Sequence, residues 1–120
     1  MIGKVSGRKP LINITLILPN KPRITLEFVV DTGFDGLLML SPEAVKLLDL
    51  PCLYSLDANL ADGRKKSATV HGAMIEWDGE ERIVEVLAMG NRPLAGTLLM
   101  DQCELLIQFS ETGIVTIDPL

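Results

Sequence analysis

A single carboxylate at the end of an apolar strand is the part of the sequence best suited to chemistry. Asp31 follows Val29 and Val30, whose β-branched side chains favour a buried strand, and it precedes Thr32 and Gly33. A carboxylate beside apolar neighbours is costly unless it accepts hydrogen bonds, and the Thr32 hydroxyl and the amides of the following turn are candidate donors. Because carboxylates placed in this way are often functional, Asp31 is a candidate catalytic residue.

The run Asp31-Thr32-Gly33 resembles the active-site loop of the aspartic proteases. A second apolar-apolar-glycine element, Leu94-Ala95-Gly96, follows later in the chain, as it does in that family. The order of these parts is similar to that of the single-domain, retropepsin-like branch, especially the small bacterial proteins with Phe after the glycine, here Phe34. The resemblance covers residues 10–118. It implies that Leu94, Ala95 and Gly96 pack beside the catalytic loop and support it.

The resemblance implies an aspartic endopeptidase in which Asp31, Thr32 and Gly33 form the catalytic loop. In this chemistry two aspartates share one proton: one takes a proton from water while the other hydrogen-bonds the substrate carbonyl. The chain carries one such motif, so a two-fold axis must supply the second Asp31 from another copy. The implied partners are a second copy of the chain and a peptide or protein substrate, and no cofactor or metal is implied.

A glycine turn at Asp62-Gly63 occupies the place of the family's flap, the β-hairpin that closes over substrate. Ala61, Asp62 and Gly63 are therefore expected to face substrate, together with Phe34. An ordinary surface turn is the alternative for this hairpin. Asp35 is a possible second carboxylate within the same chain, but a residue that caps the turn or faces solvent is the preferred interpretation.

Phe34 departs from the family pattern, because many relatives have Ser or Thr at this place. A hydroxyl there can hydrogen-bond the catalytic carboxylate, and Phe cannot, so the Asp31 pair is expected to hold its shared proton more tightly. The departure keeps a second function open. In that alternative the same fold serves as a catalytically weak or inactive peptide-binding or dimerisation module.

The pattern of apolar residues predicts a mainly β chain with one short helix. Ser41-Pro42 predicts the helix start and Pro51 its end. The resemblance implies that these elements form a retropepsin-like acid-protease barrel, and Ile114 to Ile117 is expected to offer an unpaired strand to the dimer interface. The predicted strands cover residues 11–18, 23–30, 37–40, 53–60, 67–77, 82–89, 104–109 and 114–117, with a short helical turn at 97–102.

Composition limits the classes of function further. The chain has 120 residues, 48% of them apolar and 22% charged, which indicates one globular domain over residues 1–120. A net charge of −5 disfavours a nucleic-acid partner. No apolar run approaches the ~20 residues of a membrane span, and the start does not resemble a signal peptide, so a cytoplasmic location is expected. Cys52 and Cys103 are expected as buried thiols, and His71, the sole histidine, as a strand-surface residue.

Overall fold

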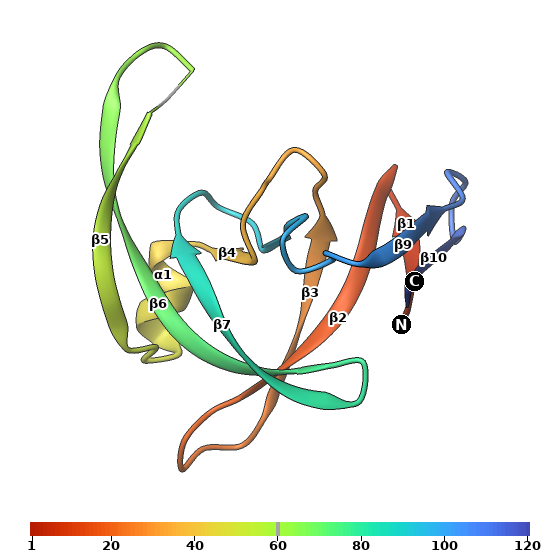
Figure 1. The fold of residues 1–120 in the computed structure, drawn as a ribbon, viewed down its shortest axis with the longest axis horizontal. Helices are drawn as coiled ribbons and strands as arrows, with labels where there is room; N and C mark the ends of the chain where they lie inside the picture. The colour runs from red at the N-terminus through yellow and green to blue at the C-terminus, as the bar shows by residue number, and fades with distance from the viewer. Residues whose placement is uncertain (60) are drawn as a thin grey trace.

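The computed structural model describes residues 1–59 and 61–120 and consists mainly of one ten-stranded sheet (Figure 1). A single helix, α1 (Pro42–Leu47), lies between the fourth and fifth strands. The strands are β1 (Ile2–Ser6), β2 (Lys9–Ile17), β3 (Ile24–Val30), β4 (Leu38–Leu40), β5 (Cys52–Asn59), β6 (Lys65–Trp77), β7 (Glu80–Ala88), β8 (Leu94–Ala95), β9 (Cys103–Ile107) and β10 (Ile114–Pro119).

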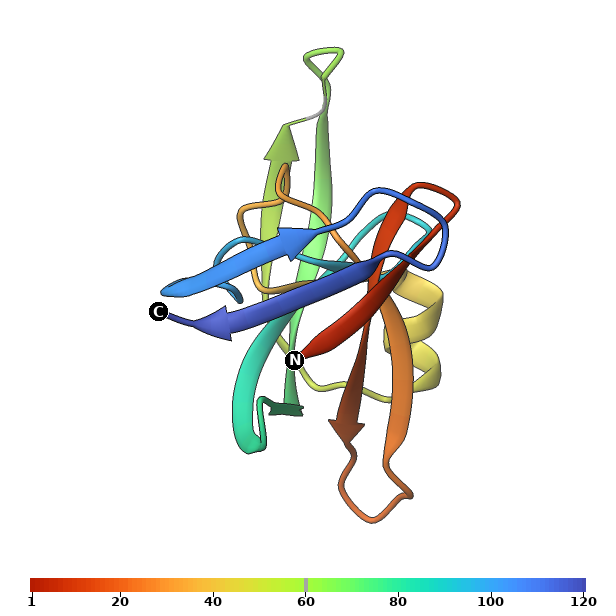
Figure 2. The ribbon, with the colours of Figure 1, turned by 90° about the vertical axis from the view of Figure 1, so that its right-hand side faces the viewer.

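The sheet closes on itself and forms a barrel. Its strand order is β5-β6-β7-β4-β8-β3-β2-β1-β10-β9, and β6 also pairs with β2 through Leu16 and Ile75. This extra pairing joins β6, β7, β4, β8, β3 and β2 into a ring. It leaves β5 attached at one side, while β1, β10 and β9 form the opposite side, which faces the viewer in Figure 2.

Alternation along the strands fills the barrel. On β2 the side chains of Ile12, Ile14 and Leu16 are buried, while Asn13 between them is exposed. This period of two is what a strand with one face toward a core requires. Phe28 on β3 joins the same core. Each fully buried side chain of this size stabilises the fold by roughly 1.5–3 kcal/mol relative to an exposed one.

The helix begins where the sequence predicted. Ser41 is its N-cap, and the Ser41 Oγ accepts a hydrogen bond from the Ala44 amide at 3.1 Å, with Pro42 at the first helical position. Only Val45 of the helix is buried. α1 is the sole helix of residues 1–59 and 61–120, and it has neither the length nor the apolar character needed to cross a membrane.

The edges of the sheet differ from the expectation. β10 pairs with β1 on one side and with β9 on the other, so the prediction that Ile114 to Ile117 is an unpaired strand is wrong. The N-terminal strand β1, which the sequence pattern did not predict, covers the edge that β10 would otherwise expose. The free edge on this side of the sheet belongs to β9.

Smaller expectations had different outcomes. Residues 97–102 form a turn, in which the Met100 amide donates to the Thr97 carbonyl and the Asp101 amide to the Leu98 carbonyl, and it does not extend into a regular helix. Cys52 is exposed and Cys103 half-buried, so neither is the fully buried thiol that was expected. His71 is half-buried, with Nδ1 2.9 Å from the Leu50 carbonyl oxygen and Nε2 2.8 Å from the Thr69 hydroxyl. Leu60, the last residue of the strand predicted at 53–60, lies outside the described residues.

Candidate active site

Asp31 directly follows β3 and is fixed by the neighbouring strand β8. The two strands run parallel, with Val29 opposite Leu94 and Val30 opposite Ala95. The Val29 amide donates to the Pro93 carbonyl at 3.0 Å, and the Asp31 amide donates to the Ala95 carbonyl at 2.9 Å. The backbone of Asp31 is therefore held by the sheet itself, although the residue stands at the start of a loop.

The Asp31 side chain is half-buried and is oriented by its own turn. Its Oδ1 accepts a hydrogen bond from the Gly33 amide at 2.8 Å, and its carbonyl accepts one from the Phe34 amide at 3.2 Å. The expected turn-amide donor is thus present. Within residues 1–59 and 61–120 the exposed Thr32 hydroxyl makes no hydrogen bond to the carboxylate. The arrangement leaves Oδ2 of Asp31 available to a water or a substrate.

Leu94, Ala95 and Gly96 lie directly behind the Asp31 loop. β8 is inserted between β3 and β4, and it pairs antiparallel with β4 through Leu38 and Ala95. The Gly96 amide donates to the Leu37 carbonyl at 2.9 Å. A Cβ at position 96 would overlap the Gly36 carbonyl oxygen and lie 2.7 Å from Cδ2 of Phe34. Only glycine fits this contact, which holds the two halves of the loop together.

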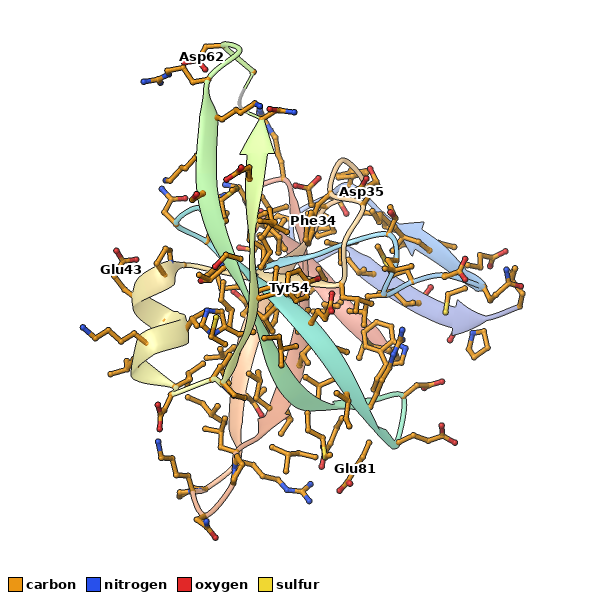
Figure 3. The ribbon with its side chains drawn as sticks, turned by 60° about the vertical axis from the view of Figure 1, so that its left-hand side comes forward. Phe34, Asp35, Glu43, Tyr54, Asp62 and Glu81 are labelled. Atoms are coloured by element: carbon orange, nitrogen blue, oxygen red, sulfur yellow. The ribbon has the colours of Figure 1, made fainter. Side chains whose placement is uncertain are left out.

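The Phe34 ring packs back across the loop. It is half-buried, and a Cβ added to Gly36 would lie 2.6 Å from its Cζ, so the ring covers Gly36 as well as Gly96. The Phe34 carbonyl accepts a hydrogen bond from the Thr97 amide at 2.8 Å. Asp35, the next residue, is exposed, in agreement with the preferred interpretation (Figure 3).

A pocket of about 160 Å³ lies beside this loop, on one face of the neighbouring strands β5, β6 and β7. Its two functional groups are Tyr54 and Glu85, and the Tyr54 hydroxyl donates to Glu85 Oε2 at 2.8 Å. The sequence interpretation missed both residues. Alternation along the predicted strands, which places Tyr54 with Leu56 and Glu85 with Leu87, was the available signal. The apolar part of the wall consists of Phe34, Leu37, Leu38, Leu56, Val70, Leu87 and Leu98.

The hydrogen bond to the Glu85 carboxylate raises the pKa of Tyr54 above its usual value, with smaller contributions from desolvation and from the negative charge of Glu85. The phenol therefore stays protonated at neutral pH and continues to donate to Glu85.

The hairpin tip does not reach the Asp31 loop. Ala61, Asp62 and Gly63 are exposed at the end of the β5–β6 hairpin, which projects beyond the barrel (Figures 1 and 3). The Asp62 carboxylate interacts within the hairpin tip. Its Oδ1 accepts a hydrogen bond from the Arg64 amide at 3.1 Å, and its Oδ2 lies 2.5 Å from Arg64 Nε. Among the described residues no hydrogen bond joins Ala61–Gly63 to residues 31–36.

The polar groups at the site are the Asp31 and Glu85 carboxylates, the Tyr54 hydroxyl and backbone groups of the loop. In the described part of the chain no three His, Cys, Asp or Glu residues are placed to hold a metal ion. The structure brings together the Asp31 loop, Leu94–Gly96 and Phe34, and it adds Tyr54 and Glu85 beside them.

The likeness of this chain to known proteins lies in its fold. No protein-family model matches the sequence, and no curated protein matches it significantly. Among solved structures, a retropepsin-like aspartic protease from Rickettsia conorii is similar to this chain, with a TM-score of 0.63 and 16% sequence identity. The match covers 99% of this chain and 89% of the other. At this identity the likeness concerns the fold, and the chain has a mainly β, retropepsin-like fold.

Proposed function

We propose that this chain, acting as one domain over residues 1–120, is an aspartic endopeptidase that hydrolyses peptide bonds as a homodimer. The observation that carries the proposal is the position of Asp31 at the end of β3 in a retropepsin-like fold. The Asp31 amide is fixed there by its hydrogen bond to the Ala95 carbonyl. Gly96 stands directly behind the loop, where a larger residue would not fit. The agreement of motif, fold and support favours catalysis over a chance Asp-Thr-Gly sequence.

The proposed reaction uses two Asp31 carboxylates, one from each subunit, that share one proton. The ionised carboxylate removes a proton from a water molecule, and the protonated one hydrogen-bonds the substrate carbonyl oxygen as the water attacks. The proton taken from water then passes to the departing amine as the carbon–nitrogen bond breaks. Two close carboxylates resist double ionisation, as is established for aspartic proteases, so the two pKa values belong to the pair. The reaction requires no cofactor.

The homodimer is needed because each chain supplies one Asp31 loop. The free edge of β9 can pair with its copy across a two-fold axis. The strand register places the exposed side chains of Ile2 on β1, Ile114 on β10 and Leu106 on β9 on one face. Phe109, in the turn between β9 and β10, is also exposed. Together they offer apolar surface that a second copy would cover.

Substrate contacts in the proposal come from two regions. Phe34 contributes to the pocket wall beside the loop. Ala61, Asp62 and Gly63 would reach substrate after the β5–β6 hairpin bends toward the loop, which excludes water from the carboxylate pair. A cytoplasmic location stays a prediction from the sequence.

Asp31→Asn tests the proposal, with Asp35→Asn as the matched control in the same loop. Cleavage of a peptide library by wild type should show a bell-shaped pH profile, since one carboxylate must be ionised and one protonated. Asp31→Asn should lose at least about a thousandfold in rate while keeping the wild-type circular dichroism spectrum, and Asp35→Asn should keep most of its activity. Equal cleavage by wild type and Asp31→Asn would refute the mechanism. Peptide binding without cleavage in either protein would favour the binding-module alternative.

Sedimentation across protein concentration, measured beside activity, tests the dimer. Activity should rise with the dimer fraction, and mixing wild type with excess Asp31→Asn should suppress it, because mixed dimers hold one functional carboxylate. Full activity in a sample that sediments as a monomer would contradict the shared site.

A further inference from the structure

The pocket beside the Asp31 loop combines an apolar wall with one carboxylate. The apolar part includes Phe34, Leu56 and Val70, and the carboxylate is that of Glu85. The volume of about 160 Å³ is close to that of an engineered apolar cavity, roughly 150 Å³, that binds benzene. One large side chain of a bound peptide would therefore fill it.

The hairpin and β7 present these residues on one face. On β5 and β6, Tyr54 is paired with Val70 and Leu56 with Ala68, so their side chains project to the same side of the hairpin. Glu85 on β7 is paired with Gly72 on β6, two residues from Val70, so Glu85 projects to the same side of the sheet as Tyr54. Leu98 is 51% exposed and Tyr54 is 45% exposed, so both have surface to lose to a ligand.

Glu85 is held in position but is only partly satisfied. The Tyr54 hydroxyl donates to Oε2, and within residues 1–59 and 61–120 the carboxylate accepts no other hydrogen bond and forms no ion pair. In the free protein, water can solvate Oε1 because Glu85 is exposed. A purely apolar ligand side chain would displace that water without donating a hydrogen bond to Oε1, and desolvating a charged group in this way is costly.

We propose that this pocket selects a peptide side chain with a long apolar stem and a cationic end, as in lysine or arginine, and that Glu85 is the specificity-determining residue. The stem would pack against Phe34, Leu56 and Val70, and the cation would donate to the free oxygen of Glu85. Tyr54 acts as a positioning residue, since its hydroxyl fixes the carboxylate before the ligand arrives. This inference rests on the proposed peptide-binding role of the site and names the substrate class that it accepts.

Lysine and norleucine separate the cation from the stem, because their side chains share the same methylene chain. The probes are dye-labelled octapeptides on a common background of Ala, Val and Leu, in which each position in turn carries lysine or norleucine. Binding is measured by fluorescence anisotropy on full-length Asp31→Asn, so that cleavage does not interfere. The same variant is then combined with Glu85→Gln, with Tyr54→Phe, or with Glu80→Gln. Glu80 is an exposed glutamate about 17 Å along β7, and its substitution makes the same charge change outside the pocket.

At one peptide position, lysine should bind about five- to tenfold tighter than norleucine. Added salt should weaken this preference. Glu85→Gln should abolish it, Tyr54→Phe should reduce it, and Glu80→Gln should preserve it. Equal or tighter binding of norleucine at every position would overturn the inference. A lysine preference that survives Glu85→Gln, or failure of every peptide to bind, would also overturn it.

The binding assay also separates this inference from the proposed catalysis. Glu85-dependent lysine binding together with a wild type that cleaves none of these peptides would refute the hydrolase and retain the pocket. Cleavage by wild type with no Glu85-dependent preference would retain the hydrolase and refute the pocket.

Discussion

The Asp31 loop and the β5–β6 hairpin are built in opposite ways. Backbone hydrogen bonds join residues 31–37 to Ala95, Gly96 and Thr97. The Phe34 ring packs closely against Gly36 and Gly96. The hairpin pairs mainly with itself toward its end, because among the described residues β5 has only β6 as a neighbour in the sheet. Residues 61–67 at and beside the tip are all exposed.

The difference separates a rigid element from one that is free to move. Catalytic groups must keep their geometry, and the dense contacts around Asp31 provide this. A lid must open and close, and segments with few buried contacts do so at low cost. The Tyr54–Glu85 hydrogen bond lies at the base of the hairpin, where the hairpin joins the more rigid part of the barrel.

Gly96→Ala should disrupt the packing of the Asp31 loop and cause the largest loss of stability among these variants. The added Cβ meets the Gly36 carbonyl oxygen and the Phe34 ring, so the loop must shift, and we expect a loss of about 3 kcal/mol in the free energy of unfolding. Gly72→Ala is the matched control, because its Cβ would meet only Leu53 side-chain atoms at 3.5 Å or more. Urea denaturation measures both. Equal midpoints for the two variants would contradict the close packing at Gly96.

Phe34→Ser should also destabilise the Asp31 loop, but by less than Gly96→Ala. The ring is half-buried against Gly36 and Gly96, so its loss should cost about 2 kcal/mol, below the 3–5 kcal/mol of a fully buried Phe. Phe109→Ser is the control, because Phe109 is 69% exposed and should cost less than about 0.5 kcal/mol in the monomer. Thermal unfolding at a concentration where the protein is monomeric gives both values. A Phe34→Ser protein as stable as Phe109→Ser would show that the ring does not hold the loop.

Asp62→Ala should leave global stability almost unchanged. The Asp62–Arg64 pair is exposed, and such pairs contribute about 0–1 kcal/mol. The local effect should be visible instead, as faster amide hydrogen exchange at Arg64, whose amide loses its acceptor. A large fall in the urea midpoint would mean that the tip is tied to the barrel and is not an independent arm.

Glu85→Gln should have the smallest effect on stability of these variants. Its measurable effect should be a lower pKa of Tyr54. The Glu85 carboxylate raises this pKa by accepting the hydroxyl hydrogen bond, and a neutral amide favours the protonated phenol less. Because the folded pKa is raised, the hydrogen bond stabilises the protein below the unfolded pKa of about 10, and this contribution disappears as pH rises through the folded value. Tyr54 is the only tyrosine, so ultraviolet titration reports it alone. An unchanged titration curve, matching that of Glu80→Gln, would contradict the contact.

The sequence by itself determined the elements that depend on neighbours in the chain. Ser41 and Pro42 define the helix start because an N-cap acts on amides two and three residues away. The alternation at Ile12, Ile14 and Leu16 identifies a strand with one buried face. The position of Asp31 after an apolar strand is likewise a local property, and the resemblance of its motif to aspartic proteases supplied the expectation of Leu94–Gly96 behind it.

Only the tertiary structure decided which distant segments meet. Residue pattern cannot show that β8 inserts between β3 and β4, that β1 covers one edge of β10, or that β9 keeps a free edge, because strand pairing depends on the whole barrel. The packing of Phe34 on Gly96 follows from the β8 insertion. The meeting of Tyr54 with Glu85 follows from the pairing of β5, β6 and β7, which places two residues from separate strands on one face of the sheet.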